Sequence, residues 1–179
     1  YGDATDSGNT KKDTVQGILD LAGGGWTTGT EQATTSGTAF DFTGIPSGTK
    51  VIHINPFGVS MSGTDNFLIQ IGDSGGFETS GYLSESHQIV ATTVSQDSST
   101  AGFIVLIANA ATVASGIMTL SLEDATNHTW VSSHVWKNAS NRTAFGAGDK
   151  TLSGELTQVR ITRTGSNTFG DGAINIQYQ

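Results

Sequence analysis

The sequence contains no cysteine and only two prolines among its 179 residues. The lack of cysteine excludes disulfides and thiolate metal sites, and it leaves the redox compartment undetermined. Charged residues are also scarce, at 13% against about 25% in average globular proteins. Serine, threonine, asparagine and glutamine supply the polar surface instead. This composition is more typical of extracellular β-proteins than of intracellular enzymes.

Positive charge is the scarcer kind of charge. Eight Lys and Arg residues stand against sixteen Asp and Glu residues, which gives a net charge of −8. The basic residues are scattered, so the chain has no footprint for a nucleic-acid backbone or for an anionic membrane surface. The longest apolar stretch, "GFIVLIANAATVASGIM", is interrupted by Asn, Thr and Ser. We therefore expect neither a nucleic-acid partner nor insertion into a membrane.

The first 37 residues differ from the rest and are predicted to form a polar linker with a short helix at about 13–22. The chain begins at Tyr1 rather than Met, which suggests a piece of a longer protein. Val15, Ile18 and Leu19 would form the apolar face of a helix too short to be stable alone. That face either packs on the sheet of its own chain or meets two further copies in a three-chain bundle. These three residues are therefore our candidates for trimer contacts.

Residues 38–179 predict about ten β-strands separated by turns rich in Gly, Ser, Asp and Asn. No helical pattern lies between them, which favours an all-β antiparallel sandwich of the jelly-roll kind. In the last segment, "GDGAINIQYQ", Ile174 and Ile176 alternate with polar residues up to the final position. This alternation predicts a strand that ties the C-terminus into a sheet. The segment 137–150 is expected to be a loop.

The residue types needed for catalysis show no recognisable arrangement. None of the histidines has metal-ligand spacing, and the carboxylates lie mainly in turn contexts. The string "GDSGG" at 72–76 resembles the segment around the nucleophile of trypsin-like proteases. However, the chain lacks that family's other motifs, so we interpret this string as a turn. We expect no enzyme activity, no catalytic residue, no metal and no cofactor.

The segment "NHTWVSSHVWKNASNRT" (127–143) offers the best candidates for binding a sugar. Saccharide sites combine an aromatic platform with a few planar polar groups. Trp130 and Trp136 are six residues apart and would face the same way in an unbroken strand. The alternative is that this face fills the core. The candidate ligand-binding residues are Trp130, Trp136, His128, His134, Asn138 and Arg142.

Three strings carry a resemblance to a known group of proteins: "FDFTGIPSGTKVIHINPFGVSMSGTDNFLIQIGDSGGFETSGYLS", "SGIMTLSLEDATNHTWVSSHV" and "GAGDKTLSGELTQVRITRTGSNTFGDGAINIQYQ". Together they make residues 38–179 resemble the C-terminal domains of tail-fibre and other virion structural proteins of tailed bacteriophages. The resemblance implies an exposed virion appendage that is a homotrimer. It also implies attachment to other virion proteins through the N-terminal side, and no enzyme activity.

The function predicted from these features is recognition of the host cell surface, with a bacterial surface polysaccharide as the partner. The expected contact surfaces are two loops, at 97–100 and 137–150, because binding residues concentrate on loops held by a rigid scaffold. One alternative is a capsid fibre or decoration protein. Another is a monomeric carbohydrate-binding module of a secreted enzyme. A depolymerase or esterase has only scattered carboxylates and hydroxyls in its favour.

Overall fold

The structure is a computed structural model that describes residues 25–107, 110, 112–138 and 142–179. Within these ranges all regular elements are β-strands, and every strand pairing is antiparallel. The predicted all-β class is therefore confirmed. The helix expected at about 13–22, with Val15, Ile18 and Leu19, lies outside the described residues. The described part of the chain includes no helix with the length and apolarity needed to cross a membrane.

The larger of two sheets has nine strands in the order β1-β14-β4-β10-β11-β12-β7-β8, with β2 also pairing with β14. Sequence neighbours β10, β11 and β12 lie side by side, as do β7 and β8. These strands are β1 (Thr27–Thr28), β2 (Gln32–Ala33), β4 (Val51–Met61), β7 (Tyr82–Val90), β8 (Thr93–Ser99), β10 (Ala114–Asp124), β11 (Thr129–Asn138), β12 (Arg142–Thr151) and β14 (Phe169–Tyr178).

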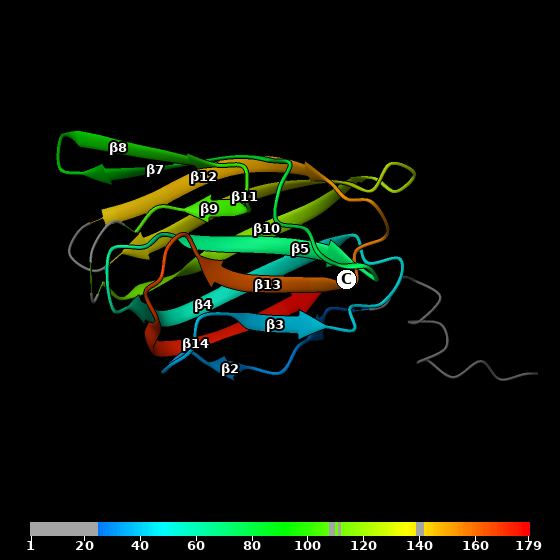
Figure 1. Cartoon of the computed structure of the whole chain (residues 1–179), viewed down its shortest axis with the longest axis horizontal. Helices are drawn as coiled ribbons and strands as arrows, with labels where there is room; N and C mark the ends of the chain where they lie inside the picture. The colour runs from blue at the N-terminus through cyan, green and yellow to red at the C-terminus, as the bar shows by residue number, and fades with distance from the viewer. Residues whose placement is uncertain (1–24, 108–109, 111, 139–141) are drawn as a thin grey trace, which may run out of the picture.

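The smaller sheet has five strands in the order β3-β13-β5-β6, with β9 also pairing with β5. Its strands are β3 (Phe40–Thr43), β5 (Phe67–Asp73), β6 (Gly76–Phe77), β9 (Phe103–Val105) and β13 (Gln158–Arg163). In Figure 1 this sheet lies in front of the large one, and the β7–β8 hairpin extends beyond it at the upper left. The two sheets form a sandwich-like arrangement, of which the small sheet covers one face of the large.

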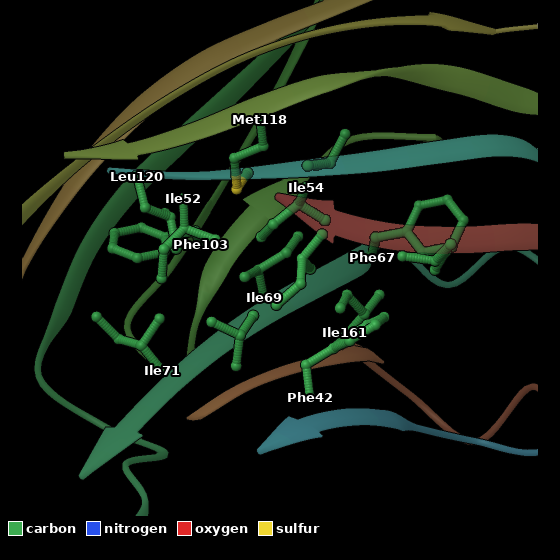
Figure 2. Packing of buried hydrophobic residues seen from close by; sticks show 14 of the residues in the cluster. Phe42, Ile52, Ile54, Phe67, Ile69, Ile71, Phe103, Met118, Leu120 and Ile161 are labelled. Carbon is green, nitrogen blue, oxygen red and sulfur yellow. The ribbon is translucent and has the colours of Figure 1, made fainter. Parts of the chain in front are cut away.

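The core lies between the two sheets. Strands of the large sheet alternate buried and more exposed residues, whereas all seven residues of β5 are buried. Each fully buried large apolar side chain stabilises the fold by about 1.5–3 kcal/mol. Figure 2 shows part of this core, with Ile52, Ile54, Met118 and Leu120 from the large sheet and Phe42, Phe67, Ile69, Ile71, Phe103 and Ile161 from the small sheet.

Glycines on the inner face of the large sheet make room for rings from neighbouring strands. A Cβ atom at Gly116 would lie 2.8 Å from Cδ1 of Trp136, and one at Gly148 would lie 3.0 Å from Cδ1 of Phe103. A Cβ atom at Gly146 would lie 2.5 Å from Cε1 of His134. At each position the Cβ would also lie within 2.6 Å of a carbonyl oxygen of a neighbouring strand, so the glycines permit the close approach of both backbone and rings.

Side chains of β7 hold the free edge of β9. One edge of β9 pairs with β5, and the N–H groups of Ile104 and Leu106 point away from that partner. They donate to the hydroxyl oxygens of Ser84 (2.9 Å) and Ser86 (3.0 Å). Because buried N–H groups without partners are costly, these hydroxyls replace the strand that would otherwise be needed there.

The C-terminal end is part of the large sheet, as the alternation in the last segment predicts. Strand β14 pairs with β4 along most of its length. Beyond it, the carbonyl of Gln179 accepts hydrogen bonds from Lys50 N (2.7 Å) and Val51 N (3.1 Å). These bonds connect the final residue to the beginning of β4.

Two segments differ from the sequence prediction. Residues 25–37 were expected to lie in the linker, but β1 and β2 within this range pair with β14. Segment 137–150 was expected to be a loop, but most of it forms β12, which pairs with β11 over ten positions. The reason for the second error is composition. Gly146, Gly148 and Asp149 suggest a turn, although here the glycines accommodate rings within a strand.

Substitution Gly146→Ala is expected to lower the free energy of unfolding by about 1–3 kcal/mol, because the new Cβ would overlap the Glu85 carbonyl and crowd the His134 ring. Urea unfolding measures the change. The matched control is Gly170→Ala in β14, where the new Cβ would approach only Ser60 Oγ, at 3.4 Å. That control is expected to stay within about 0.5 kcal/mol of the wild type. Equal stability of the two variants would contradict the packing described here.

Candidate functional site

The tryptophans of β11 point into the core. Trp130 and Trp136 are each 1% exposed, and the ring of Trp136 packs against Phe67 with centroids 5.2 Å apart. Neither indole N–H has a hydrogen-bond partner among the described residues. The exposed aromatic platform expected from these two residues is therefore wrong, and the alternative, that this face fills the core, is correct. The physical reason is that β11 lies in the middle of the large sheet, where bulky rings bury the most area.

The other candidate sugar-binding residues do not gather on one accessible surface either. His134 and Asn138 share the buried inner face of β11. His128 lies in the turn before β11 with a φ of 55°, outside the strand, so it does not share that face. Arg142 begins β12 and lies opposite Asn138 in the register. The predicted site is thus divided between the core and the two ends of β11.

A buried histidine and serine form a hydrogen bond inside the sandwich. His134 lies opposite Gly146, which in turn lies opposite Ser86. The His134 ring therefore crosses β12 above the glycine, and its Nε2 lies 3.0 Å from Ser86 Oγ. Burial lowers the pKa of His134 to about 4. Although serine and histidine are the partners of many nucleophilic enzymes, this serine is fully buried and also accepts the Leu106 N–H. The pair is a structural one.

The best-connected acidic residues also have structural roles. Glu78 forms an ion pair with the buried Lys150 and accepts the Ser153 N–H at 2.7 Å. Burial opposes ionisation of Glu78, but these hydrogen bonds outweigh it and lower its pKa. Asp73 accepts the Ser153 hydroxyl and the Gly75 N–H, each at 2.7 Å, and these bonds lower its pKa. Together the contacts tie β12 and the segment after it to the β5–β6 turn.

The "GDSGG" string forms the turn between β5 and β6, as predicted. In the described ranges no group of three or more His, Asp or Glu side chains is arranged to hold a metal ion.

The most distinctive surface feature is a hollow on the outer face of the large sheet, which the small sheet does not cover. It has a volume of about 1000 Å³ and is lined by residues of β7, β11 and β12, together with Ser98, Ser99 and Thr100 at the end of β8 and just after it. We call it the outer hollow. Its outward-facing side chains include Leu83, Glu85, His87, Val131, Val135 and Phe145.

The register explains the shape of the outer hollow. Val135, Phe145 and His87 are cross-strand neighbours and form one wall. Val131, Asp149 and Leu83 are neighbours in the same way and form the opposite wall. Between the walls lies a third row of cross-strand neighbours, formed by Ser133 of β11, Ala147 of β12 and Glu85 of β7. The first two of these side chains are small.

One wall of the outer hollow carries an aromatic pair. The Phe145 and His87 rings are stacked with centroids 5.8 Å apart and an interplanar angle of 17°. Phe145 is 39% exposed. Carboxylates of Glu85 and Asp149 and the hydroxyl of Ser133 lie within the same lining. The outer hollow thus combines apolar ring surface with hydrogen-bonding groups at fixed positions.

The sequence prediction placed its candidate residues on the inner face of β11, whereas the outer hollow lies on the outer face of this strand. In β11 the apolar residues occur on both faces, with Trp130 and Trp136 inside and Val131 and Val135 outside. A strand that is apolar on both faces indicates a contact on each, and this signal was present in the sequence. Phe145 was missed because its segment was assigned to a loop.

Comparison of the chain with protein-family models, with curated proteins and with solved structures finds no match. The resemblance to bacteriophage virion proteins therefore rests on the sequence strings alone and stays a prediction.

Lowering the pH from 6.5 to 4 is expected to destabilise the fold by about 2–3 kcal/mol through His134. The unfolded chain binds a proton at this histidine near pH 6.5, whereas the folded chain does so only near pH 4, so stability is lost as the pH falls through this window. NMR titration of the imidazole and urea unfolding between these pH values test this. His134→Gln should remove the His134 part of the slope. A folded-state pKa near 6.5 would contradict the buried, neutral histidine.

Proposed function

We propose that this chain is a structural domain of a bacteriophage virion. It forms a homotrimeric fibre tip and recognises a glycan of the host cell surface through the outer hollow. The observation that carries the recognition part is the exposed Phe145–His87 stack beside carboxylate and hydroxyl groups, on the sheet face that the small sheet leaves uncovered.

The chemistry of the outer hollow suits a sugar ring. The C–H groups of a pyranose pack on an aromatic face, and its hydroxyls need donors and acceptors at the rim. Phe145 offers the face, and Glu85, Asp149 and Ser133 offer the polar groups. These side chains project from paired strands, which fix their relative positions better than loops would.

The virion and trimer parts of the proposal rest on the resemblance of residues 38–179 to tail-fibre domains. We assign the domain to the jelly-roll-like sandwiches of such proteins, preceded by the short helix at about 13–22. Its N-terminal side would connect to other virion proteins. Three copies on one tip would bind a repetitive surface by avidity even when each site is weak.

Two other assignments use the same features differently. A capsid fibre or decoration protein would share the fold and the exposed position on a virion. A carbohydrate-binding module of a secreted enzyme would use the outer hollow as a monomer. Oligomeric state separates this last assignment from the virion proposals.

The solution mass measured by light scattering is expected to be about three times the 18.5 kDa chain mass, because cyclic homotrimers are closed assemblies. The measurement uses the full chain, so that residues 1–24 are present. A concentration series from micromolar upward checks that the mass does not drift. A constant mass of one chain would overturn the trimer and favour the carbohydrate-binding module.

Substitution Phe145→Ala is expected to weaken binding of a bacterial surface glycan about tenfold, since it removes the aromatic platform. The assay is an array of purified bacterial cell-surface polysaccharides, followed by titration of those that bind the wild type. The matched control is Phe57→Ala, because Phe57 is 78% exposed and lies outside the lining of the outer hollow. Equal effects of the two substitutions, or no polysaccharide bound by the wild type, would reject the outer hollow as a glycan site.

A further inference from the structure

We infer that the glycan is a linear, uncharged polysaccharide chain that crosses the outer face from the Phe145–His87 stack to a second aromatic stack, Trp26–His53. This inference rests on the proposed glycan-binding function and specifies the ligand of that site. The second aromatic stack lies on the same outer face, toward the opposite edge of the large sheet and outside the outer hollow.

The second stack is formed by a residue that the sequence analysis did not single out. Trp26 precedes β1 and lies against His53 of β4, with ring centroids 4.3 Å apart and an interplanar angle of 27°. The tryptophan is 45% exposed, whereas Trp130 and Trp136 are buried. One face of the indole is covered by His53, so the exposed part offers apolar ring surface to a ligand.

A continuous row of cross-strand neighbours connects the two stacks. His53 of β4 lies opposite Thr119 of β10, which lies opposite Ser133 of β11. Ser133 lies opposite Ala147 of β12, and Ala147 opposite Glu85 of β7. All five side chains point to the outer face, because their sequence neighbours on both sides fill or approach the core side. We call them the central row.

No bulky side chain interrupts the middle of the central row, where it leads from the outer hollow toward β4. Its middle members, Thr119, Ser133 and Ala147, are small, and the first two carry hydroxyls. Larger side chains flank them, with Ile117 and Val135 on one side and Val131 on the other. A chain lying along the row would therefore find hydrogen-bonding groups beneath it and apolar groups beside it.

The length of the row favours a polymer. Neighbouring strands lie about 4.8 Å apart, so the four steps from β4 to β7 span about 19 Å. A monosaccharide or disaccharide cannot reach both aromatic stacks across that distance. A linear polysaccharide can contact both stacks and the row between them at once.

The charges along this path argue against an anionic glycan. The lining of the outer hollow contains Glu85 and Asp149 and no Lys or Arg, and the whole chain carries a net charge of −8. Uronate or phosphate groups would meet two carboxylates with no Lys or Arg in the lining to balance them, which is unfavourable on the surface and more so once water is displaced. Neutral sugars meet no such repulsion, and their hydroxyls can donate to these carboxylates.

The test uses the full chain and the polysaccharides of the array, sorted into neutral and uronate- or phosphate-bearing members. Bound neutral polysaccharides are cleaved into fragments of one or two sugars and fragments of six or more. Trp26→Ala is expected to weaken binding of the long fragments about tenfold and to leave the short fragments unchanged. Trp26→Phe, which keeps a ring at this position, should restore most of the affinity. Phe145→Ala should weaken binding of both lengths.

The outcomes distinguish failure of the inference from failure of the proposed function. Unchanged binding of the short fragments shows that Trp26→Ala remains folded. If the wild type binds neutral glycans but Trp26→Ala binds the long fragments normally, the contact with the second aromatic stack is wrong and the outer hollow remains a glycan site. Preference for uronate- or phosphate-bearing members would overturn the uncharged ligand. If the wild type binds no polysaccharide, both the inference and the glycan function fail.

Discussion

The free edge of β9 imposes the constraint on which much of this structure depends. Ile104 and Leu106 are buried, and within the described residues no strand pairs with β9 on the side of their N–H groups. Ser84 and Ser86 on the inner face of β7 accept them. Just after the end of β9, the carbonyl of Ile107 accepts from the side-chain amides of Gln88 (3.4 Å) and Asn138 (3.0 Å). Side chains of one sheet thus complete the hydrogen bonding of the other.

The same constraint explains why strand β7 carries apolar residues on the outer face. Three inner positions of β7, those of Ser84, Ser86 and Gln88, carry hydroxyl and amide groups that bond the backbone of β9 and the residues just after it. The apolar residues Leu83 and Ile89 of β7 therefore face outward, the reverse of the usual order in a sheet with one solvated side. In β11 the outward Val131 and Val135 add to this surface. The outward position of the apolar residues of β7 is thus a consequence of how its inner face is used.

Several features were predictable from local pattern. The all-β class follows from alternation and turn residues, and the C-terminal strand follows from Ile174 and Ile176. The candidate site was less predictable. Period-2 alternation places Trp130 and Trp136 on one face of a strand but does not say whether that face is inside. Phe145 was hidden because the glycines beside it resemble a turn. Only the tertiary structure shows why glycine is needed there, since a Cβ would meet carbonyl oxygens of β7 and the rings of His134 and Phe103.

The sequence by itself determined the strand class, the scarcity of basic surface and the absence of cysteine chemistry, because these depend on composition and on neighbours close along the chain. Only the tertiary structure decided which face of each strand is buried and which distant side chains meet. His134 and Ser86, or His53 and Trp26, come together through strand order and register. Those are set by packing the whole sheet, since a shift of one residue would exchange the two faces of a strand.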